Sequence, residues 1–219
     1  MKKIAFFNHK GGVSKTTSTF HIGWKLAEQG NKVLLIDADS QCNLSLTILG
    51  NDKYESFYEN ENKNNIKDAV APAFRAATKS IEPVECIKVN GNENLFLLPG
   101  SINLSEWEVA LGVSFQLSNT FYTMINLPGA LNYLIEETGK KYNADYILID
   151  MNPSLSAINQ ALLVSSDYFI IPTSPDYYSI AAIKSLAEVL PKWENWGKKA
   201  RHIFEESAYP LPLNTPKFL

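Results

Sequence analysis

The chain has 219 residues, of which 45% are hydrophobic, and this is enough to bury the core of one domain. The formal net charge is −3, so the chain lacks the overall positive charge that would attract nucleic acid. No apolar run reaches the length of a membrane span. Cys42 and Cys86 lack the spacing of a disulfide framework, which is typical of a reducing cytosol. We therefore expect a cytoplasmic protein that has no contact with a membrane.

The first predicted element is a short apolar strand over residues 4–7, and a glycine-rich loop over residues 10–17 follows it. Glycines let the backbone approach an anion closely, and amide N–H groups at the start of a helix point at that anion. Lys15 supplies a positive charge for outer phosphates, and Thr16 supplies a hydroxyl for Mg²⁺. The loop therefore predicts a phosphate-binding site.

The match to the phosphate-loop pattern G-x-x-x-x-G-K-[ST] is imperfect, because His9 and Ser14 stand where the two glycines belong. If the Ser14 position needs a positive φ, serine strains it by about 1–3 kcal/mol, whereas a helical φ accommodates serine. A strand-to-helix turn without a ligand is the alternative interpretation of the loop.

Two further apolar runs, residues 33–36 and 146–149, each end in acidic residues. Asp37 and Asp39 follow the first run, and Asp150 follows the second. Short continuous apolar runs are typical of parallel strands buried on both faces, and ligands bind beyond the carboxyl ends of such strands. Magnesium prefers oxygen ligands, which often act through water. A single aspartate here could cap a helix, but three beside the loop favour an Mg²⁺-nucleotide site.

The remaining elements alternate along the chain, and this alternation predicts an α/β fold with a mostly parallel twisted sheet and helices on both faces. Residues 52–65 are polar and predict an exposed excursion that carries partner specificity. Predicted helices span residues 15–29, 43–49 (a short helix or a turn), 66–74, 104–111, 129–142, 154–165 and 179–193. Predicted strands span residues 84–89, 95–98 and 169–172 (a buried strand), and another strand starts at 216–219 after a proline-broken linker.

Four motifs in this order resemble the ParA/Soj-type deviant Walker-A ATPases, a group that also includes MinD and the nitrogenase iron protein. The family's K-G-G-x-G-K-[ST]-[ST] matches residues 10–17, its D-x-D-P-Q matches 37–41, its Walker B motif matches 149–154, and its P-x-x-P-[DE]-[YF] matches 172–177. The resemblance extends to about residue 190. It implies a three-layer α/β/α P-loop ATPase domain over residues 1–219, with a family-variable insertion at 51–94.

The resemblance also assigns roles to residues of this chain. Lys15 is expected to be the P-loop lysine, Thr16 the Mg²⁺ ligand and Asp39 the residue that orients the attacking water, while Asp37 and Asp150 hold Mg²⁺ through water. The loop at 172–177 is expected to border the adenine. The nucleotide-binding residues implied are Lys10, Gly11, Gly12, Val13, Ser14, Lys15, Thr16, Thr17, Pro172, Thr173, Pro175, Asp176 and Tyr177.

Lys10 resembles the signature lysine that reaches across a dimer to the partner's nucleotide. Arginine fingers commonly stabilise the charge of phosphoryl transfer, yet the chain has only two arginines, Arg75 and Arg201, and neither lies in a motif. A lysine of the loop is therefore the better candidate for that role. A solvated, exposed lysine is the alternative.

The resemblance implies a protein that binds Mg-ATP, forms a nucleotide-sandwich homodimer and hydrolyses ATP slowly to position DNA or a protein cargo, together with a ParB-like adaptor. Ser14, Ser40 and Asn152 replace a glycine and two prolines of the family pattern. Ser14 and Ser40 leave a second function possible, namely an ATP-gated regulatory or scaffold protein with little or no turnover. A nitrogenase-type reductase needs cluster-holding cysteines, which Cys42 and Cys86 do not provide. A MinD-type protein needs a terminal amphipathic helix, which the proline-rich end does not provide, and the loop signature argues against a small-molecule kinase.

The C-terminal part contains one basic-aromatic cluster, which could grip nucleic-acid phosphates or could be a solvated helix end. Because family members continue with a further strand and helices, we expect that the chain is truncated after Leu219 or lacks the usual last elements. Cys42, three residues after Asp39, is expected to be a small side chain of the switch region, and a redox role is the alternative. The cluster comprises Lys192, Trp193, Trp196, Lys198, Lys199, Arg201 and His202.

Overall fold

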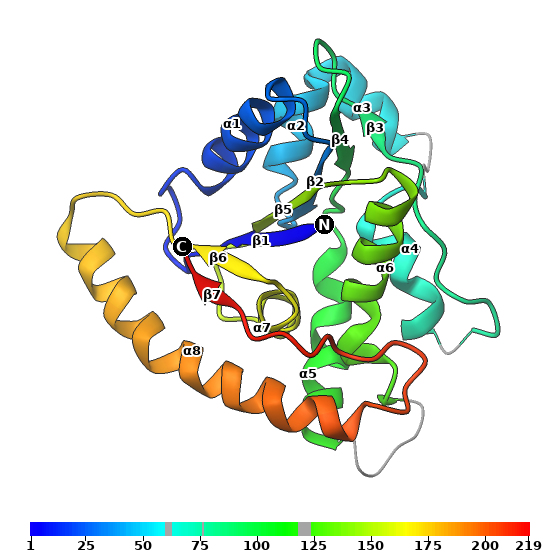
Figure 1. The fold of residues 1–219 in the computed structure, drawn as a ribbon, viewed down its shortest axis with the longest axis vertical. Helices are drawn as coiled ribbons and strands as arrows, with labels where there is room; N and C mark the ends of the chain where they lie inside the picture. The colour runs from blue at the N-terminus through cyan, green and yellow to red at the C-terminus, as the bar shows by residue number, and fades with distance from the viewer. Residues whose placement is uncertain (60–62, 76, 118–123) are drawn as a thin grey trace.

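The computed structural model describes residues 1–59, 63–75, 77–117 and 124–219. Helices flank a central sheet on both faces, so the predicted α/β architecture is confirmed (Figure 1). The strands are β1 (Lys2–Phe6), β2 (Val33–Ala38), β3 (Ile87–Lys88), β4 (Leu95–Leu98), β5 (Tyr146–Met151), β6 (Tyr168–Ile170) and β7 (Lys217–Phe218). The helices are α1 (Lys15–Glu28), α2 (Asn43–Leu49), α3 (Asn51–Glu59), α4 (Ile66–Phe74), α5 (Glu108–Leu117, after a 3₁₀ turn at Leu104–Trp107), α6 (Leu127–Lys141), α7 (Ala157–Val164) and α8 (Tyr177–Ile203).

The described strands form one seven-stranded sheet in the order β3-β4-β2-β5-β1-β6-β7. Every neighbouring pair is parallel except β3 and β4, which are antiparallel. The central strands β1, β2 and β5 are apolar along most of their length and almost wholly buried, as expected for parallel strands covered on both faces. The three apolar runs of the sequence are therefore the centre of the sheet.

The pairing register brings the three predicted motifs to one edge of the sheet. Asp150 of β5 pairs with Phe6 of β1 on one side and with Asp37 of β2 on the other. The glycine-rich loop begins directly after Phe6, so the loop and both aspartates lie at the carboxyl ends of adjacent strands. This is the edge where open parallel sheets bind ligands.

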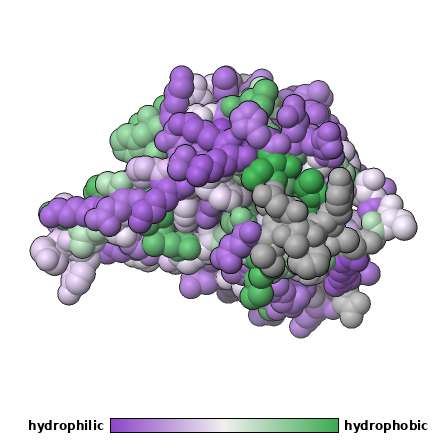
Figure 2. All heavy atoms as spheres, turned by 90° about the horizontal axis from the view of Figure 1, so that it is seen from below, coloured by the Kyte–Doolittle hydropathy of each residue, from purple (hydrophilic) through white to green (hydrophobic). Residues whose placement is uncertain are grey.

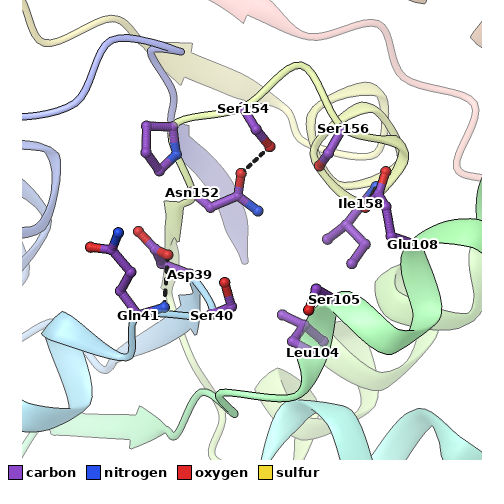
Figure 3. Close-up of a pocket in the computed structure, with 11 residues that line it drawn as sticks. Asp39, Ser40, Gln41, Leu104, Ser105, Glu108, Asn152, Ser154, Ser156 and Ile158 are labelled. Atoms are coloured by element: carbon purple, nitrogen blue, oxygen red, sulfur yellow. Dashed lines mark hydrogen bonds between the residues drawn. The ribbon is translucent and has the colours of Figure 1, made fainter.

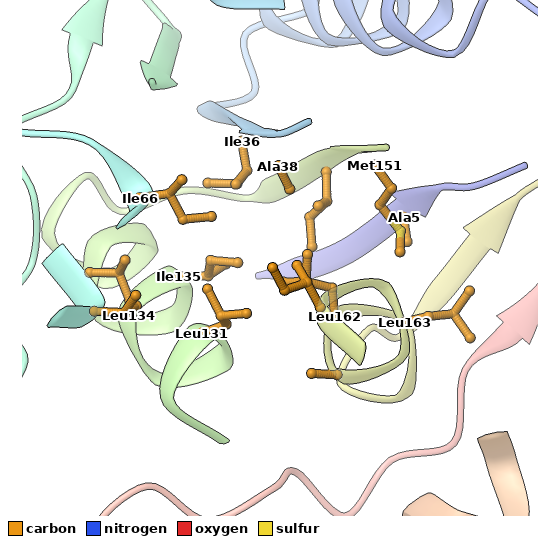
Figure 4. Close-up of a cluster of buried hydrophobic side chains, with 14 of the residues drawn as sticks. Ala5, Ile36, Ala38, Ile66, Leu131, Leu134, Ile135, Met151, Leu162 and Leu163 are labelled. Atoms are coloured by element: carbon orange, nitrogen blue, oxygen red, sulfur yellow. The ribbon is translucent and has the colours of Figure 1, made fainter. Parts of the chain in front are cut away.

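Two hydrophobic clusters hold the layers together, one on each face of the sheet. Alternate residues of β2 point to opposite faces: Leu35 contacts the cluster under α1, and Ile36 contacts the larger cluster under α4 and α6. Gly23 lets α1 approach closely, because a Cβ there would stand 2.6 Å from a methyl of Leu35. Figure 4 shows Ile36, Ile66 and Leu134 meeting in the larger cluster.

The segment predicted as an exposed polar excursion is partly helical. Helix α3 covers Asn51–Glu59, and none of its residues is fully buried. The prediction of exposure is confirmed for most of α3, whereas the rings of Tyr54, Phe57 and Tyr58 are half-buried. Their spacing places the three rings on one side of the helix. The rest of residues 51–94 supplies α4 and β3, and residues 60–62 lie outside the described part.

Other predicted elements differ in bounds or burial, among them the helix expected over 104–111, which is a 3₁₀ turn at Leu104–Trp107 followed by α5 up to Leu117. The strand expected over 84–89 shrinks to Ile87–Lys88, and β6 is half-buried rather than buried. Helix α8 runs ten residues beyond the expected end at Trp193, because Gly197 and Ala200 continue its buried face. The strand expected at the C-terminus is present as β7, which pairs with β6.

Candidate functional site

The loop between β1 and α1 surrounds an open pocket of about 630 Å³. Seven consecutive loop residues line it, and they are joined by residues of the β2–α2 connection, of α2 and of the β5–α7 connection. The loop that the sequence predicts as a phosphate-binding site, including Lys15 and Thr16, therefore lines an open pocket. The lining residues are Gly11, Gly12, Val13, Ser14, Lys15, Thr16, Thr17, Asp39, Gln41, Asn43, Thr47 and Pro153.

The loop adopts the left-handed backbone conformation twice, at Gly12 with φ 73° and at Ser14 with φ 62°. Glycine adopts a positive φ without steric cost, whereas a residue with a Cβ does not. Ser14 therefore stores about 1–2 kcal/mol of strain directly before the first turn of α1. Its side chain also makes no capping hydrogen bond to that helix.

Lys15 is a buried cation. Its ammonium donates a hydrogen bond to the carbonyl oxygen of Lys10 at 3.2 Å, and no described carboxylate lies within ion-pair distance of it. Burial lowers the pKa of Lys15, while Asp150 and Asp39 nearby oppose that shift. A buried ammonium that lacks a direct counter-ion among the described residues creates a binding position for an anion.

Asp150 is the complementary case, a buried carboxylate that is 1% exposed. Neither of its oxygens has a hydrogen-bond partner of regular geometry among the described residues. Burial raises the pKa of Asp150 to about 7, the nearby Thr16 hydroxyl opposes that shift, and the neighbouring Asp37 and Asp39 add to it. A weakly partnered carboxylate beside Thr16 at a strand end fits a role in holding a hydrated Mg²⁺ ion.

No group of three or more acidic, histidine or cysteine side chains in the described part of the chain could hold a metal ion by itself. A magnesium ion at this edge therefore needs oxygens from other sources. The hydroxyl of Thr16, which lines the pocket, and the phosphates of a nucleotide are the groups that suit it.

Asp37 differs from Asp150, because the protein already satisfies its oxygens. It is fully buried, and its Oδ2 accepts hydrogen bonds from the backbone N–H of Ser45 at 2.7 Å and from the Ser45 hydroxyl at 2.6 Å. Its Oδ1 accepts a bond from the Asp39 N–H at 3.3 Å. Burial raises the pKa of Asp37 to about 6. This position favours an anchoring role for Asp37 over the predicted contact with a magnesium-bound water.

Asp39 lies between the loop pocket and a second, smaller pocket of about 260 Å³. Its Oδ1 accepts a hydrogen bond from the Gln41 N–H at 2.9 Å, which fixes the turn into α2. Figure 3 shows Asp39 on one side of the second pocket with Asn152, and Glu108 on the other. Asp39 thus faces open space in a position suited to orienting a water molecule.

Asn152, the residue that replaces a family proline, is held by the buried side chain of Asn159. The Asn159 amide nitrogen donates hydrogen bonds to the carbonyl oxygen of Asn152 at 2.9 Å, to its side-chain oxygen at 3.0 Å and to the carbonyl oxygen of Ser154 at 2.7 Å. The loop after Asp150 is therefore ordered by side-chain hydrogen bonds. Sequence reasoning did not identify Asn159, because an asparagine inside a helix carries no motif signal.

Lys10 extends away from the loop pocket. Its ammonium lies 2.5 Å from the Asp176 carboxylate and 3.0 Å from the Ser179 hydroxyl. This ion pair lowers the pKa of Asp176. Asp176 also caps α8, because its carboxylate accepts a hydrogen bond from the Ser179 N–H at 2.9 Å. The structure thus brings together two predicted site residues that are 166 positions apart.

The segment at 172–177, predicted to border the adenine, is connected to the glycine-rich loop by hydrogen bonds of Asn8. The Asn8 side chain donates to the Pro172 carbonyl oxygen at 2.9 Å and accepts from the Lys10 N–H at 3.0 Å. Tyr177 is 77% exposed at the start of α8. The residues that line the loop pocket do not include Pro172, Thr173, Pro175, Asp176 or Tyr177.

Comparison with known proteins adds an independent finding. A family model described as an AAA domain matches residues 1–200. The chain is 31% identical over 185 residues to the sporulation initiation inhibitor protein Soj of Bacillus subtilis, a match that covers 84% of this chain and 63% of Soj. The chain belongs to the ParA/Soj family.

Solved structures place this ParA/Soj family member among the P-loop folds. A Corynebacterium diphtheriae protein superposes with a TM-score of 0.84 at 26% identity, covering all of this chain and 81% of that one. A Borrelia burgdorferi plasmid partition protein bound to AMPPNP gives 0.63 at 28% identity, covering 87% of this chain and 70% of that one. The chain spans 63% of the length of Soj.

Three of the seven residues of the basic-aromatic cluster pack against the body of this family member, and the other four, Lys192, Lys198, Lys199 and His202, are exposed. Trp193 stacks on Phe7 with ring centroids 5.6 Å apart, and Trp196 lies 4.1 Å from Phe115. Arg201 donates a hydrogen bond to the carbonyl oxygen of Pro212 at 2.6 Å. The two tryptophans and Arg201 therefore serve packing. Figure 2, the view from below, shows hydrophilic residues with hydrophobic patches between them. The exposed basic residues fit both a solvated helix end and a contact with nucleic-acid phosphates.

Both cysteines are free, and Cys42 is buried. Burial raises the pKa of the Cys42 thiol to about 12, which agrees with a small packing side chain rather than a redox group. No helix among the described residues is long and apolar enough to cross a membrane.

Proposed function

We propose that this protein binds Mg-ATP at residues 10–17, dimerises face to face around two nucleotides and hydrolyses ATP slowly. The cycle positions DNA or a protein cargo in the cytoplasm, with a ParB-like protein as adaptor. Membership of the ParA/Soj family supports the proposal. The bound AMPPNP of the Borrelia burgdorferi partition protein supports an adenine nucleotide as the ligand.

The observation that carries the proposal is a pair of buried, opposite charges that have few direct partners at one edge of the sheet. Among the described residues, Lys15 has one carbonyl partner and no ion pair, and Asp150 has no hydrogen-bond partner of regular geometry. A buried polar group without a partner costs on the order of 1–3 kcal/mol of folding free energy, and a buried charge without a partner costs more. A phosphate group beside Lys15 and a hydrated magnesium ion beside Asp150 satisfy both.

The loop residues bind and orient the phosphates in this proposal. Backbone N–H groups of residues 11–17 surround the anion, Lys15 neutralises the outer phosphates and Thr17 bonds an inner phosphate. The Thr16 hydroxyl and, through water, Asp150 hold the magnesium ion, which supplies charge neutralisation when it is bound. Asp39 orients the attacking water from its position between the two pockets.

Lys10 and the segment at 172–177 complete the proposed cycle. In this structure Lys10 is held by Asp176 and Ser179. We propose that Lys10 leaves these partners and reaches the nucleotide of the second subunit when the dimer closes. Residues Pro172, Thr173, Pro175, Asp176 and Tyr177 then border the adenine, and the Asn8–Pro172 bond couples that border to the loop.

A second candidate function is an ATP-gated regulatory or scaffold protein with little turnover. The positive φ of Ser14 favours this alternative, because strain in the loop weakens the positioning of phosphates that phosphoryl transfer requires. Comparing turnover of the wild type with that of Asp39→Ala separates the two functions. Equal rates would assign the protein to the scaffold class.

Titration calorimetry with Mg-ATP tests the binding step. The wild type is expected to bind with a dissociation constant of about 1–100 μM, and Lys15→Ala is expected to bind at least about tenfold more weakly. Lys25→Ala is the matched control, because Lys25 is an exposed lysine on the same helix α1. Equal affinity of wild type and Lys15→Ala would contradict the proposal.

A further inference from the structure

Gly100, which follows β4, lies directly against Asp37. A Cβ at this position would stand 3.0 Å from Asp37 Cγ and 3.0 Å from Cys42 Sγ, so no larger residue fits without a shift. The Gly100 N–H also donates a hydrogen bond to the Ser45 hydroxyl at 3.0 Å. The turn after β4 is thus built into the segment that joins β2 to α2.

Ser45 is the centre of this arrangement. It is fully buried on α2, and its hydroxyl donates to Asp37 Oδ2 at 2.6 Å while it accepts from the Gly100 N–H. Its backbone N–H donates to the same Asp37 oxygen at 2.7 Å. Both hydrogen-bonding functions of the hydroxyl are therefore used, and both partners lie in other elements.

Tyr58 connects helix α3 to Gly100. Its hydroxyl donates a hydrogen bond to the Gly100 carbonyl oxygen at 2.8 Å. Helix α3 has no fully buried residue, and its half-buried rings, among them the Tyr54–Tyr58 pair with centroids 4.6 Å apart, attach it to the body. An element held by so little buried surface opens at low free energy. Tyr58 therefore joins a weakly held helix to a tightly packed segment.

We propose that Ser45 and Tyr58 are positioning residues for Asp39, acting through one chain of hydrogen bonds that runs from Tyr58 through Gly100 and Ser45 to Asp37. The last hydrogen bond of this series is the one that Asp37 Oδ1 accepts from the Asp39 N–H. The Asp39 carbonyl oxygen in turn accepts a hydrogen bond from the Cys42 N–H at 2.9 Å. The position of α3 thereby sets the turn that carries Asp39. The consequence for turnover rests on the proposed function, whereas the coupling itself does not.

Amide hydrogen–deuterium exchange in the nucleotide-free protein tests the coupling. Tyr58→Phe removes only the hydroxyl, and Tyr178→Phe, which removes the hydroxyl of an exposed tyrosine on α8, is the control. Tyr58→Phe is expected to speed exchange about threefold or more in peptides covering residues 37–45 and 99–101, while Tyr178→Phe leaves them unchanged. Faster exchange confined to residues 51–59 would show that Tyr58 only attaches α3, and the proposal would be wrong.

Single-turnover hydrolysis and Mg-ATP binding test the effect on the site. Ser45→Ala is expected to lower the hydrolysis rate about tenfold with ATP affinity changed less than about twofold, and Ser45→Thr to restore most of the rate. Adding Tyr58→Phe to Ser45→Ala is expected to have no further effect, because the chain is already broken. Independent, additive losses would overturn the proposal. A wild type without ATP binding would instead remove the proposed function, and the exchange experiment would still decide the coupling.

Discussion

The ammonium of Lys10 lies 2.5 Å from the carboxylate of Asp176, and Asp176 is at the same time the residue that caps α8. The ion pair is partly solvent-exposed, with side-chain exposures of 24% and 40%. Lys10 is therefore held beside the start of α8 in this structure. Any function of Lys10 in a dimer requires that this contact be broken.

Asp176→Asn is expected to favour the ATP-dependent dimer. Asparagine still caps a helix well, so the start of α8 is preserved, but the charge that holds Lys10 is removed. Because exposed ion pairs contribute little, the dimer dissociation constant is expected to fall about twofold to fivefold. Analytical ultracentrifugation with Mg-ATP measures it. Glu188→Gln, an exposed charge removal on the same helix, is the control, and an equal shift in both variants would argue against release of Lys10.

Ser14→Gly is expected to stabilise the protein and to improve nucleotide binding. The change relieves a serine at φ 62°, with an expected gain of about 1 kcal/mol in the free energy of unfolding. Urea denaturation and calorimetry measure the two effects. Asn143→Gly is the control, because Asn143 also has a positive φ, 51°, but lies far from the loop in the sequence and outside the pocket lining. A destabilised Ser14→Gly variant would show that the serine makes a contact that offsets its strain.

Asp150 is expected to make the nucleotide-free protein less stable as the pH rises. Its pKa is raised from 3.8 to about 7 in the folded state, so the folded protein binds the proton more tightly than the unfolded chain. Stability is therefore lost between about pH 4 and about pH 7, at roughly 1.4 kcal/mol for each unit of pKa difference. The Asp150→Asn variant has no ionisable group at this position, so its stability is expected not to fall over this pH range.

Thermal unfolding at pH 5 and pH 8 measures this effect. Nucleotide-free Asp150→Asn is expected to melt at a higher temperature than wild type at pH 8, with the difference shrinking at pH 5. Mg-ATP is expected to raise the melting temperature of wild type more than that of the variant. Asp52→Asn, at an exposed residue of α3, is the control for loss of charge. A variant less stable than wild type at pH 8 would contradict the account of Asp150.

The sequence was sufficient to predict the parts of the site that depend on local pattern. Three apolar runs ending in a glycine loop or in aspartates predicted the central strands, and their register placed Lys15 beside Asp150. Each family motif is also a short contiguous stretch of residues, so the sequence alone is sufficient to find it. These features follow from the buried parallel sheet, which requires continuous apolar strands and places their ends together.

The sequence could not predict contacts between distant side chains that carry no motif. The partner of Lys10 lies 166 residues away, and the Ser45–Gly100 bond joins residues 55 apart. Helix α3 was missed because its polar composition outweighed the spacing of its aromatic residues. Asp37, expected beside the metal, is instead enclosed by Ser45, and only the packing of α2 against β2 reveals this.

Size-exclusion light scattering of Asp39→Ala with and without Mg-ATP tests the central claim most directly. This variant is expected to retain ATP, because Lys15 and Asp150 are intact. The account predicts a mass that doubles with Mg-ATP, and a mass that stays that of the monomer when Lys10→Ala is added. A dimer that forms equally well without Lys10 would contradict the proposed role of Lys10, and a monomer under every condition would contradict the nucleotide-sandwich cycle for this chain.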